Sequence, residues 1–146
     1  MKITSTPSLP KLLGYLGLLP FIVPIFFLLF NPDQSLLWRH LLMTYAVIIL
    51  SFVGALHWAF AMVLDGLTEK NRCWAYVWSV IPALAGWLAL SLSAWHGALL
   101  LVMMFALNLL QDIHICRIAD LPNWYLPYRR NLSSVASACL LSSTLM

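Results

Sequence analysis

Charged side chains are scarce in this sequence, because Asp, Glu, Lys and Arg together make up only 9% of its 146 residues. A soluble domain contains about a quarter charged residues, so this composition excludes an ordinary water-soluble domain. The Lys and Arg residues stand singly or in pairs beside apolar segments, and the net charge is only +3. They form no continuous basic patch, and nucleic acid is therefore not a predicted partner.

Cysteine and catalytic motifs are also scarce. Cys73, Cys116 and Cys139 form no CxxC pair, and no His stands at a spacing from them that is typical of a zinc site. We therefore predict free thiols and no metal centre. The chain has no nucleophile elbow, P-loop, dinucleotide-binding fingerprint or HExxH motif. Nothing in the sequence supports an enzyme, and the sequence indicates no particular cofactor.

Hydrophobic residues, by contrast, make up 62% of the chain. Several stretches without a charge reach about 20 residues, which is the length that a helix needs to cross a bilayer core of about 30 Å. We predict an all-α polytopic membrane protein, with residues 1–146 forming a single transmembrane domain that folds as a bundle of five transmembrane helices. The predicted spans are residues 12–30, 41–64, 73–92, 97–117 and 131–146.

The first and the last of these spans are unusual. Residues 12–30 exceed the apolar region of a signal peptide, and no small-residue cleavage site follows them, so we predict a retained span. Pro20 and Pro24 are expected to bend it. Residues 131–146 would cover only about 24 Å as a helix. We therefore expect this helix to begin a turn earlier, or the bilayer to thin locally.

The basic residues are divided unequally between the two sides of a five-span chain. One side carries Lys2, Lys11, Lys70, Arg72, Arg117, Arg129 and Arg130, and the other side carries Arg39 alone. Because Lys and Arg are in excess in cytoplasmic loops, the N-terminus is predicted inside and the C-terminus outside. The chain shows no Arg-rich amphipathic leader, which favours the inner membrane of a bacterium over the alternative, the mitochondrial inner membrane.

His57 stands inside the apolar stretch 49–62. An imidazole in a membrane costs free energy unless another group meets it. Counting helical residues from the predicted inner end of its span puts His57 about 10 Å below the inner surface. Two interpretations stay open. One is a structural His that hydrogen-bonds a carbonyl, a Ser or water, and the other is an imidazole that accepts a proton or binds a ligand.

Asn108 and Asp112 lie four residues apart on one face of the fourth predicted span, in the same leaflet as His57. Asp112 is interpreted in two ways. It either marks the inner end of the hydrocarbon, where it reaches water and pairs with Arg129 or Arg130, or it orients His57 or a ligand. Asn108 either clamps two helices together or contacts a ligand.

Aromatic residues are abundant near the same predicted leaflet. Trp74 and Trp78 share a helix face, so they either pack within the bundle or form a stacking wall for a ring-shaped ligand. The connection before the last span is rich in aromatic residues and ends in an Arg pair, a composition typical of a membrane interface that attracts anionic lipids. Its predicted interface and lipid-contacting residues are Trp124, Tyr125, Arg129 and Arg130.

Four stretches of the sequence resemble successive motifs of one family. They are LGYLGLLPF at residues 13–21, LSFVGALHW at 50–58, SVIPALAGW at 79–87, and LPNWY at 121–125 followed by RRNL at 129–132. Over nearly its whole length the chain resembles the transmembrane protein 69 family, and the His-Trp and Leu-Pro-x-Trp-Tyr elements are the most specific of these motifs. The resemblance implies a five-span protein of bacterial inner membranes or of mitochondria with no established activity.

The functional hypothesis is a binding module with an inner-leaflet pocket, whose candidate lining residues are His57, Trp58, Trp78, Asn108 and Asp112. The predicted ligand is small and amphipathic or lipid-like, such as a quinone, a porphyrin or a lipid headgroup. The alternative is an accessory or assembly factor, which would act as a homo-oligomer or in a larger membrane complex. A transporter or an intramembrane enzyme is less favoured. The pocket hypothesis requires His57 to share a cavity with Asn108 and Asp112.

Overall fold

The computed structural model describes residues 8–146, and of Pro32 only the backbone. Lys2, which entered the topology prediction, lies outside the described residues. Every regular element of the described chain is helical, which confirms the all-α prediction. The elements are α1 (Ser8–Leu16), α2 (Leu19–Phe30), the 3-10 turn η1 (Pro32–Gln34), α3 (Ser35–Val63), α4 (Glu69–Leu90), α5 (Ala94–Ile118) and α6 (Tyr125–Leu145).

Four helical segments of the described chain are long and apolar enough to cross a membrane, and the protein is therefore a membrane-spanning one. These segments are Ser8–Phe30, Ser35–Val63, Glu69–Leu90 and Ala94–Ile118. Helix α6 is not among them, because Arg129, Arg130 and several serines lower its mean hydropathy. The predicted fifth span and the orientation of the termini stay predictions.

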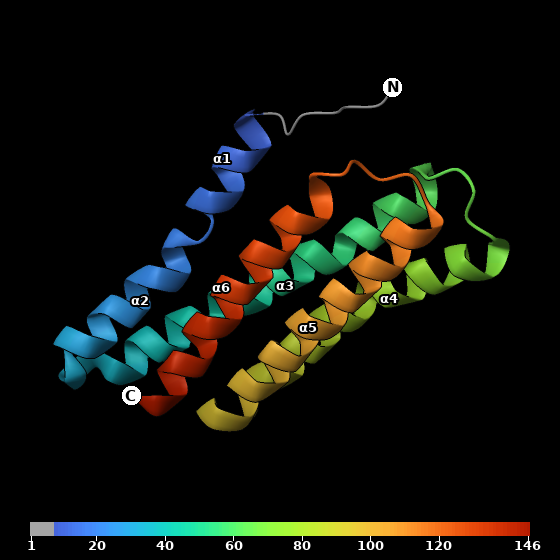
Figure 1. Cartoon of the computed structure of the whole chain (residues 1–146). Coiled ribbons are helices and arrows are strands. Elements are labelled where there is room, and N and C mark those ends of the chain that lie inside the picture. The colour runs from blue at the N-terminus through green and yellow to red at the C-terminus, as the bar shows by residue number, and fades with distance from the viewer. Residues whose placement is uncertain (1–7) are drawn as a thin grey trace.

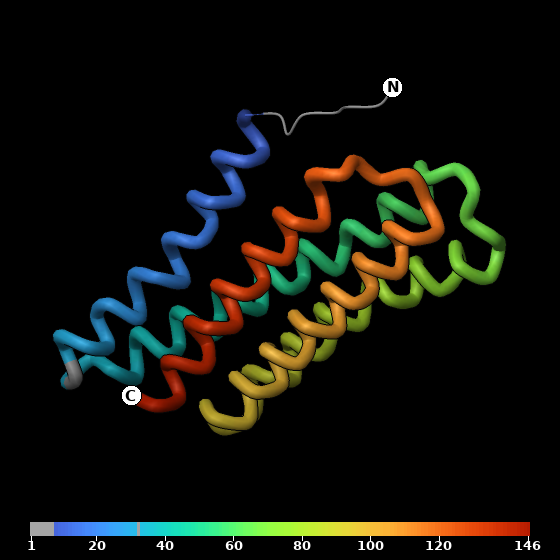
Figure 2. The backbone as a smooth tube through the Cα atoms, viewed as in Figure 1, coloured from blue at the N-terminus to red at the C-terminus, as the bar shows by residue number. Residues whose placement is uncertain are grey.

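Helices α3 to α6 run lengthwise beside one another, and α1 and α2 form one broken rod along the bundle (Figure 1). Helix α6 lies between this rod and α5, while α3 runs behind α6 (Figure 2). The direct contacts agree, since α3 packs against α2, α4 and α5, and α6 packs against α5 and α2. The connections that follow α3 and α5 lie at one end of the bundle, and the C-terminus lies at the other.

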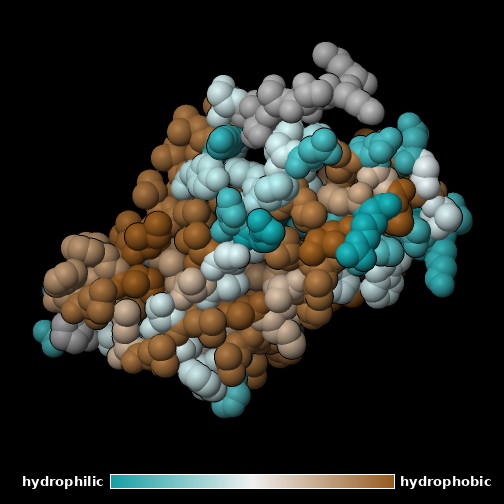
Figure 3. All heavy atoms as spheres, in the orientation of Figure 1, coloured by the Kyte–Doolittle hydropathy of each residue, from teal (hydrophilic) through white to brown (hydrophobic). Residues whose placement is uncertain are grey.

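The molecular surface is apolar along the bundle and polar at one end. Hydrophobic residues cover the face over α2, and the most hydrophilic residues gather where α3 and α5 end (Figure 3). Large apolar side chains such as Ile48, Leu84 and Trp87 are exposed on the outer faces of α3 and α4. An exposed apolar belt of this kind suits contact with lipid chains, because these are as apolar as the side chains themselves.

The first rod breaks at Gly17, between α1 and α2. Pro20 has no N–H, so the carbonyl one turn before it loses its helical donor. The chain re-forms its hydrogen bonds around Leu18, whose carbonyl accepts from the amides of Phe21 and Ile22. The Tyr45 hydroxyl of α3 donates to the carbonyl oxygen of Gly17 at 2.9 Å. The carbonyl of Gly17 is also free, because the amide of Phe21, its helical donor, donates to Leu18 instead. In lipid a freed carbonyl needs a partner, and Tyr45 thereby ties the break to α3.

Helix α6 begins at Tyr125 and not near Asn131, where the apolar run begins. Its 21 residues span about 32 Å, enough for a full crossing. Pro127 does not interrupt the helix because it lies in the first turn, where a missing N–H breaks no helical bond. The helix extends because Tyr125 and Arg129 are buried on its inner face, which apolar run length alone does not predict.

Helix α3 forms the centre of the core. Its buried residues recur at spacings of three and four, which places them on one face. They are Leu42, Met43, Ala46, Leu50, Val53, Gly54, His57 and Ala61. Gly54 allows α4 to approach closely, because a Cβ at this position would lie 2.9 Å from Cγ of Pro82 and 3.2 Å from the carbonyl oxygen of Ser79. This close approach fixes the height at which His57 sits, one turn further along α3.

Gly54→Ala is expected to destabilise the protein. The new methyl group meets a rigid proline ring and a backbone carbonyl, neither of which can rotate away. We expect a net loss of about 1–2 kcal/mol, because overpacking costs about 1–3 kcal/mol and the gain in helix propensity returns up to about 1 kcal/mol. Unfolding by SDS in mixed micelles, followed by tryptophan fluorescence, measures the change.

Gly86→Ala on α4 is the matched control. There the added Cβ would meet Cγ1 of Val47 at 2.9 Å, the tip of a side chain that can adjust, and the same propensity gain applies. Gly86→Ala should therefore cost clearly less than Gly54→Ala. Equal costs for the two variants would contradict the close approach of α3 and α4 at Gly54.

Candidate functional site

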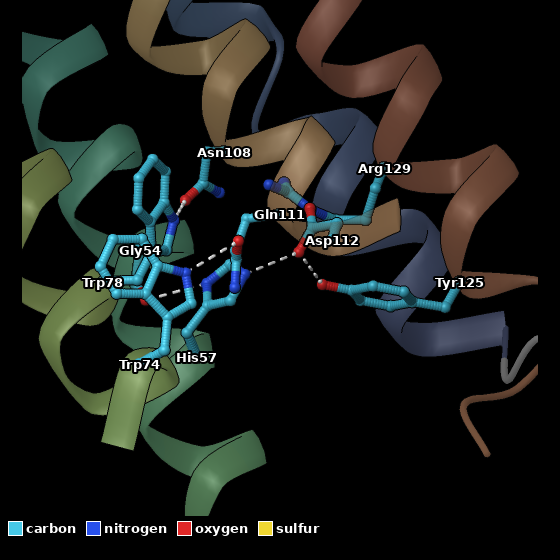
Figure 4. A network of polar contacts seen from close by, with 9 residues as sticks. All are labelled: Gly54, His57, Trp74, Trp78, Asn108, Gln111, Asp112, Tyr125 and Arg129. Atoms are coloured by element: carbon cyan, nitrogen blue, oxygen red, sulfur yellow. Dashed lines mark hydrogen bonds and ion pairs between the residues drawn. The ribbon is translucent and has the colours of Figure 1, made fainter. Parts of the chain in front are cut away.

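Asp112 is a fully buried carboxylate in the middle of the bundle. It lies on the inner face of α5 with Asn108 and Ile115, at helical spacings of four and three. Helix α6 supplies two hydrogen-bond donors one turn apart. The Tyr125 hydroxyl donates to Oδ1 and Nε of Arg129 donates to Oδ2, both at 3.0 Å (Figure 4). A buried carboxylate without such partners would be very costly, so this contact fixes the register of α5 against α6.

His57 reaches the same carboxylate from α3. Its Nε2 lies 3.4 Å from Oδ1 of Asp112, and its Nδ1 lies 3.2 Å from the carbonyl oxygen of Gly54, one turn earlier in α3 (Figure 4). Because a carbonyl oxygen only accepts, Nδ1 carries the proton of that hydrogen bond. Among the described residues Nε2 has no hydrogen-bond partner of good geometry. The ring is fully buried, so three helices converge on Asp112.

A second set of polar contacts joins α4 to α5, one turn from Asp112. The indole N–H of Trp78 donates to Oδ1 of Asn108 at 3.1 Å, and that of Trp74 donates to Oε1 of Gln111 at 3.4 Å (Figure 4). Asn108 therefore clamps two helices, one of its two predicted roles. Its Nδ2 is buried without a partner among the described residues.

The structure thus brings together four of the five candidate pocket residues. Trp58 is the exception, because it lies on the outer side of α3, half exposed, with its ring edge-on to Tyr76 at 5.0 Å between centroids. The interface candidates also divide. Arg130 is exposed, whereas Tyr125 and Arg129 are buried and serve Asp112. Asp112 does not reach water. The predicted pairing with Arg129 is therefore present without the predicted access to water, and Asp112 also lies 3.4 Å from Nε2 of His57.

The largest cavity described lies beside this cluster, between α1, α2, α3 and α6. Its volume is about 590 Å³. Its lining residues are Pro10, Leu13, Gly14, Gly17, Leu18, Phe21, Tyr45, Ile49, Phe52, Val53, Leu56, Phe105, Trp124, Tyr125, Tyr128, Arg129, Leu132, Ser133 and Ala136. None of the five candidate pocket residues is among them, so this cavity does not meet the requirement that His57 share it with Asn108 and Asp112. The cavity instead meets the buried cluster through Tyr125 and Arg129, which touch both.

Two buried polar groups of α6 lack partners where this cavity meets the cluster. Nη2 of Arg129 and Oγ of Ser133 form no hydrogen bond among the described residues, although each side chain is only 5% exposed. Asp112 accepts only from Nε, and Nη1, on the opposite edge of the guanidinium, forms no hydrogen bond among the described residues, so Arg129 keeps donor capacity on that edge. Sequence reasoning missed Ser133. The available signal was its position one helical turn after Arg129, on the same face of α6.

Two tyrosines hold the rod that closes this cavity. The Tyr128 hydroxyl of α6 donates to the carbonyl oxygen of Pro10 at 2.8 Å, and Tyr45 holds Gly17 as described above. A Cβ on Gly14 would overlap the Tyr128 hydroxyl, so a larger residue where α1 meets α6 would displace the Tyr128 side chain. Beside these contacts the walls stay apart and the cavity remains. No group of three or more His, Cys, Asp and Glu in the described residues could hold a metal ion.

Asp112→Asn is expected to lower the free energy of unfolding by about 3–5 kcal/mol, because it leaves the Arg129 guanidinium buried and uncompensated. The double variant Asp112→Asn/Arg129→Gln removes both charges and should cost less than the two single changes added together. SDS unfolding in mixed micelles measures all three variants. Asp120→Asn, at an exposed carboxylate just beyond α5, should leave stability unchanged. Strict additivity would contradict the ion pair.

Comparison with known proteins gives one match. The DUF3429 family, described as proteins of unknown function, matches residues 6–145. The matched region contains every helix from α1 to α6, and with them the buried cluster and the residues that line the cavity. No curated protein and no solved structure matches the chain. Because the family match covers nearly the whole sequence, the chain belongs to the DUF3429 family.

Proposed function

We propose that this protein binds a small amphipathic or lipid-like ligand in the cavity between α1, α2, α3 and α6. One observation carries the proposal. An apolar cavity of about 590 Å³ is lined in part by Trp124, Arg129 and Ser133, each of which has a buried polar atom without a partner among the described residues. Buried polar groups are nearly always hydrogen-bonded, so three unpaired groups on residues that line one cavity support a ligand with a polar head at this place.

The walls define the two parts of such a ligand. Leu13, Phe21, Phe52 and Phe105 offer an apolar and largely aromatic surface to its body. Arg129 offers hydrogen-bond donors to its head, so the head carries an acceptor. The cavity volume falls within the range of about 300–1,000 Å³ that is usual for small-molecule sites. Lipid headgroups, porphyrin carboxylates and quinone carbonyls all meet these requirements.

The proposed site lies beside the pocket predicted from the sequence. His57 and Asp112 stand behind Arg129 and hold its guanidinium in place, while Trp78 and Asn108 clamp α4 to α5. Direct contact of these residues with a ligand stays a prediction. The accessory-factor hypothesis remains as the competing function, and it would leave the cavity without a small-molecule occupant.

We further propose five crossings with the N-terminus inside, in the inner membrane of a bacterium. The length of α6, about 32 Å, supports a fifth crossing. The exposed basic residues Lys70, Arg117 and Arg130 lie near the end of the bundle where α3 and α5 stop, which supports a cytoplasmic position for that end. The polar end of the cavity then lies in the inner leaflet.

Leu132→Trp tests the cavity. Leu132 lines it and is only half-buried, so the larger ring can enter the open space. We expect the wild-type protein, released from nanodiscs of its native lipid, to carry a small molecule in native mass spectrometry. Leu132→Trp should lose at least half of this bound fraction, because the ring occupies the site.

Leu141→Trp on the exposed side of α6 is the matched control and should keep the ligand. Equal retention by both tryptophan variants, or a wild-type protein that carries partner proteins and no small molecule, would reject the cavity as a binding site. The second result would favour the accessory-factor hypothesis.

The orientation is tested with Cys73, which is exposed in the first turn of α4. In a variant with Cys116→Ser and Cys139→Ser, a membrane-impermeant maleimide should label intact spheroplasts hardly at all and permeabilised ones fully. Ser91→Cys, at the exposed opposite end of α4, serves as the reverse control when Cys73 is also replaced by Ser. Labelling of Cys73 in intact spheroplasts would invert the proposed topology.

A further inference from the structure

The two ring nitrogens of His57 both face oxygen atoms that accept hydrogen bonds. Nδ1 meets the carbonyl oxygen of Gly54 at 3.2 Å, and Nε2 meets Oδ1 of Asp112 at 3.4 Å. A neutral imidazole has one N–H, so it can satisfy only one of these acceptors. With the proton on Nδ1, the lone pair of Nε2 faces a carboxylate. Only the doubly protonated ring presents an N–H to both oxygens.

The second proton creates a charge that must be balanced. Asp112 and Arg129 are already a neutral pair, so a protonated His57 leaves one net positive charge in the bundle. An uncompensated charge in an apolar interior is costly. Either His57 stays neutral with Nε2 unsatisfied, or an anion arrives to compensate the cluster.

The groups that face His57 are few. Asp112 comes from α5, with Cys116 one turn further along, and Arg129 and Tyr125 of α6 reach the same carboxylate. Helix α4 packs against this part of α3 with Ser79 and Pro82 beside Gly54, with Tyr76 on the ring of Trp58, and with Arg72, a cation whose guanidinium donates to the carbonyl oxygens of Ala61 and Leu64. The charged residue of the described α1–α2 rod is Lys11, which is exposed. Asp112 is therefore the anion already used, and the cluster contains no second one.

Arg129 connects His57 to the cavity. Asp112 accepts from Nε of Arg129, and Nη1, on the edge away from Nε–H, forms no hydrogen bond among the described residues, while Arg129 itself lines the cavity. An anionic head at the cavity would gain charge-assisted hydrogen bonds from this side of the guanidinium, which are stronger than those of a neutral acceptor. The same anion would compensate the charge that His57 gains with its second proton.

We propose that the ligand is an amphipathic anion, with a carboxylate, sulfonate or phosphate head on an apolar body, and that it binds together with one proton on Nε2 of His57. The inference rests on the proposed cavity and assigns its ligand class and its proton coupling. The proton comes from the buffer acid in water, an N–H bond forms on Nε2, and no bond of the ligand breaks. Because one anion and one proton enter together, the net charge inside the bundle does not change.

Decanesulfonate is a suitable probe because it stays anionic at all working pH values and cannot carry the proton itself. Isothermal titration calorimetry of the whole protein in a nonionic detergent, in two buffers with different ionisation enthalpies at pH 8, counts the protons taken up. We expect about one proton per sulfonate. The dissociation constant should rise about tenfold for each pH unit wherever the free His57 is neutral, since one proton is bound with each anion.

Decanol and two variants complete the experiment. Decanol should bind more weakly and without proton uptake, because it brings no charge. His57→Gln cannot take up the proton, so any sulfonate binding that it keeps should not vary with pH. His114→Gln, at an exposed His on α5, should behave as the wild type. The wild-type proton count stands even if His57→Gln fails to fold.

The outcomes separate the two proposals. Sulfonate that binds the wild type without proton uptake, or proton uptake that persists in His57→Gln, overturns the coupling. If decanol and decanesulfonate bind equally well and both lose binding in Leu132→Trp, the ligand class is not anionic. The proposed binding function would still hold. If neither probe binds in a way that Leu132→Trp alters, the cavity function itself is rejected. The proton coupling is then rejected with it.

Discussion

The buried carboxylate of Asp112 is the constraint on which the arrangement of the helices depends. A carboxylate in an apolar interior is tolerated only when donors surround it. Here α6 supplies the hydroxyl of Tyr125 and the guanidinium of Arg129, and α3 brings the ring of His57 to the same group. In a membrane protein, packing between apolar faces alone has little directional preference, because lipid chains are just as apolar. This cluster supplies that preference, and it fixes the heights of α3, α5 and α6 relative to one another.

The cavity follows from a different feature, the broken first rod. Pro20 and Gly17 interrupt the helix, and the freed carbonyl is then held by Tyr45 of α3. At the other end, Tyr128 of α6 holds the backbone of α1. The rod is therefore fixed at two points and also touches α6 at Gly14, and the cavity lies beside these contacts. A gap with apolar walls costs little free energy where a lipid chain or an apolar ligand can fill it. The helices around this cavity therefore do not have to close together.

The sequence was sufficient for the helical class and for the apolar segments, because both follow from composition and run length. Helix ends were harder. α6 begins at Tyr125 because an interior partner, Asp112, stabilises Arg129 on its buried face. A prediction from the length of the apolar run places Arg129 outside the span, because it treats a charged residue as the end of the run. The proximity of His57, Asp112 and Asn108 could be predicted from helical spacing, because all three lie on buried helix faces at similar depth.

The cavity could not be predicted from the sequence, and the reason is physical. Its walls are common apolar residues, and what creates it is the angle of the rod, which depends on two tyrosine contacts between distant segments. Trp58 illustrates the same limit from the other side. It follows His57 directly in sequence, yet neighbouring residues of a helix point about 100° apart, so it lies on the outer face.

The placement of His57 behind Arg129, and not in the wall of the cavity, decides how the cluster can respond to a ligand. In the proposed binding mode a head group at the cavity would meet the guanidinium first, and it would act on the imidazole only through the shared carboxylate. The charge of the head group, more than its shape, would then decide whether His57 takes up a proton, because no atom of His57 needs to move for Nε2 to gain one. Under this proposal, the pairing that gives the bundle its register also makes the protonation of His57 depend on the charge of the occupant of the cavity.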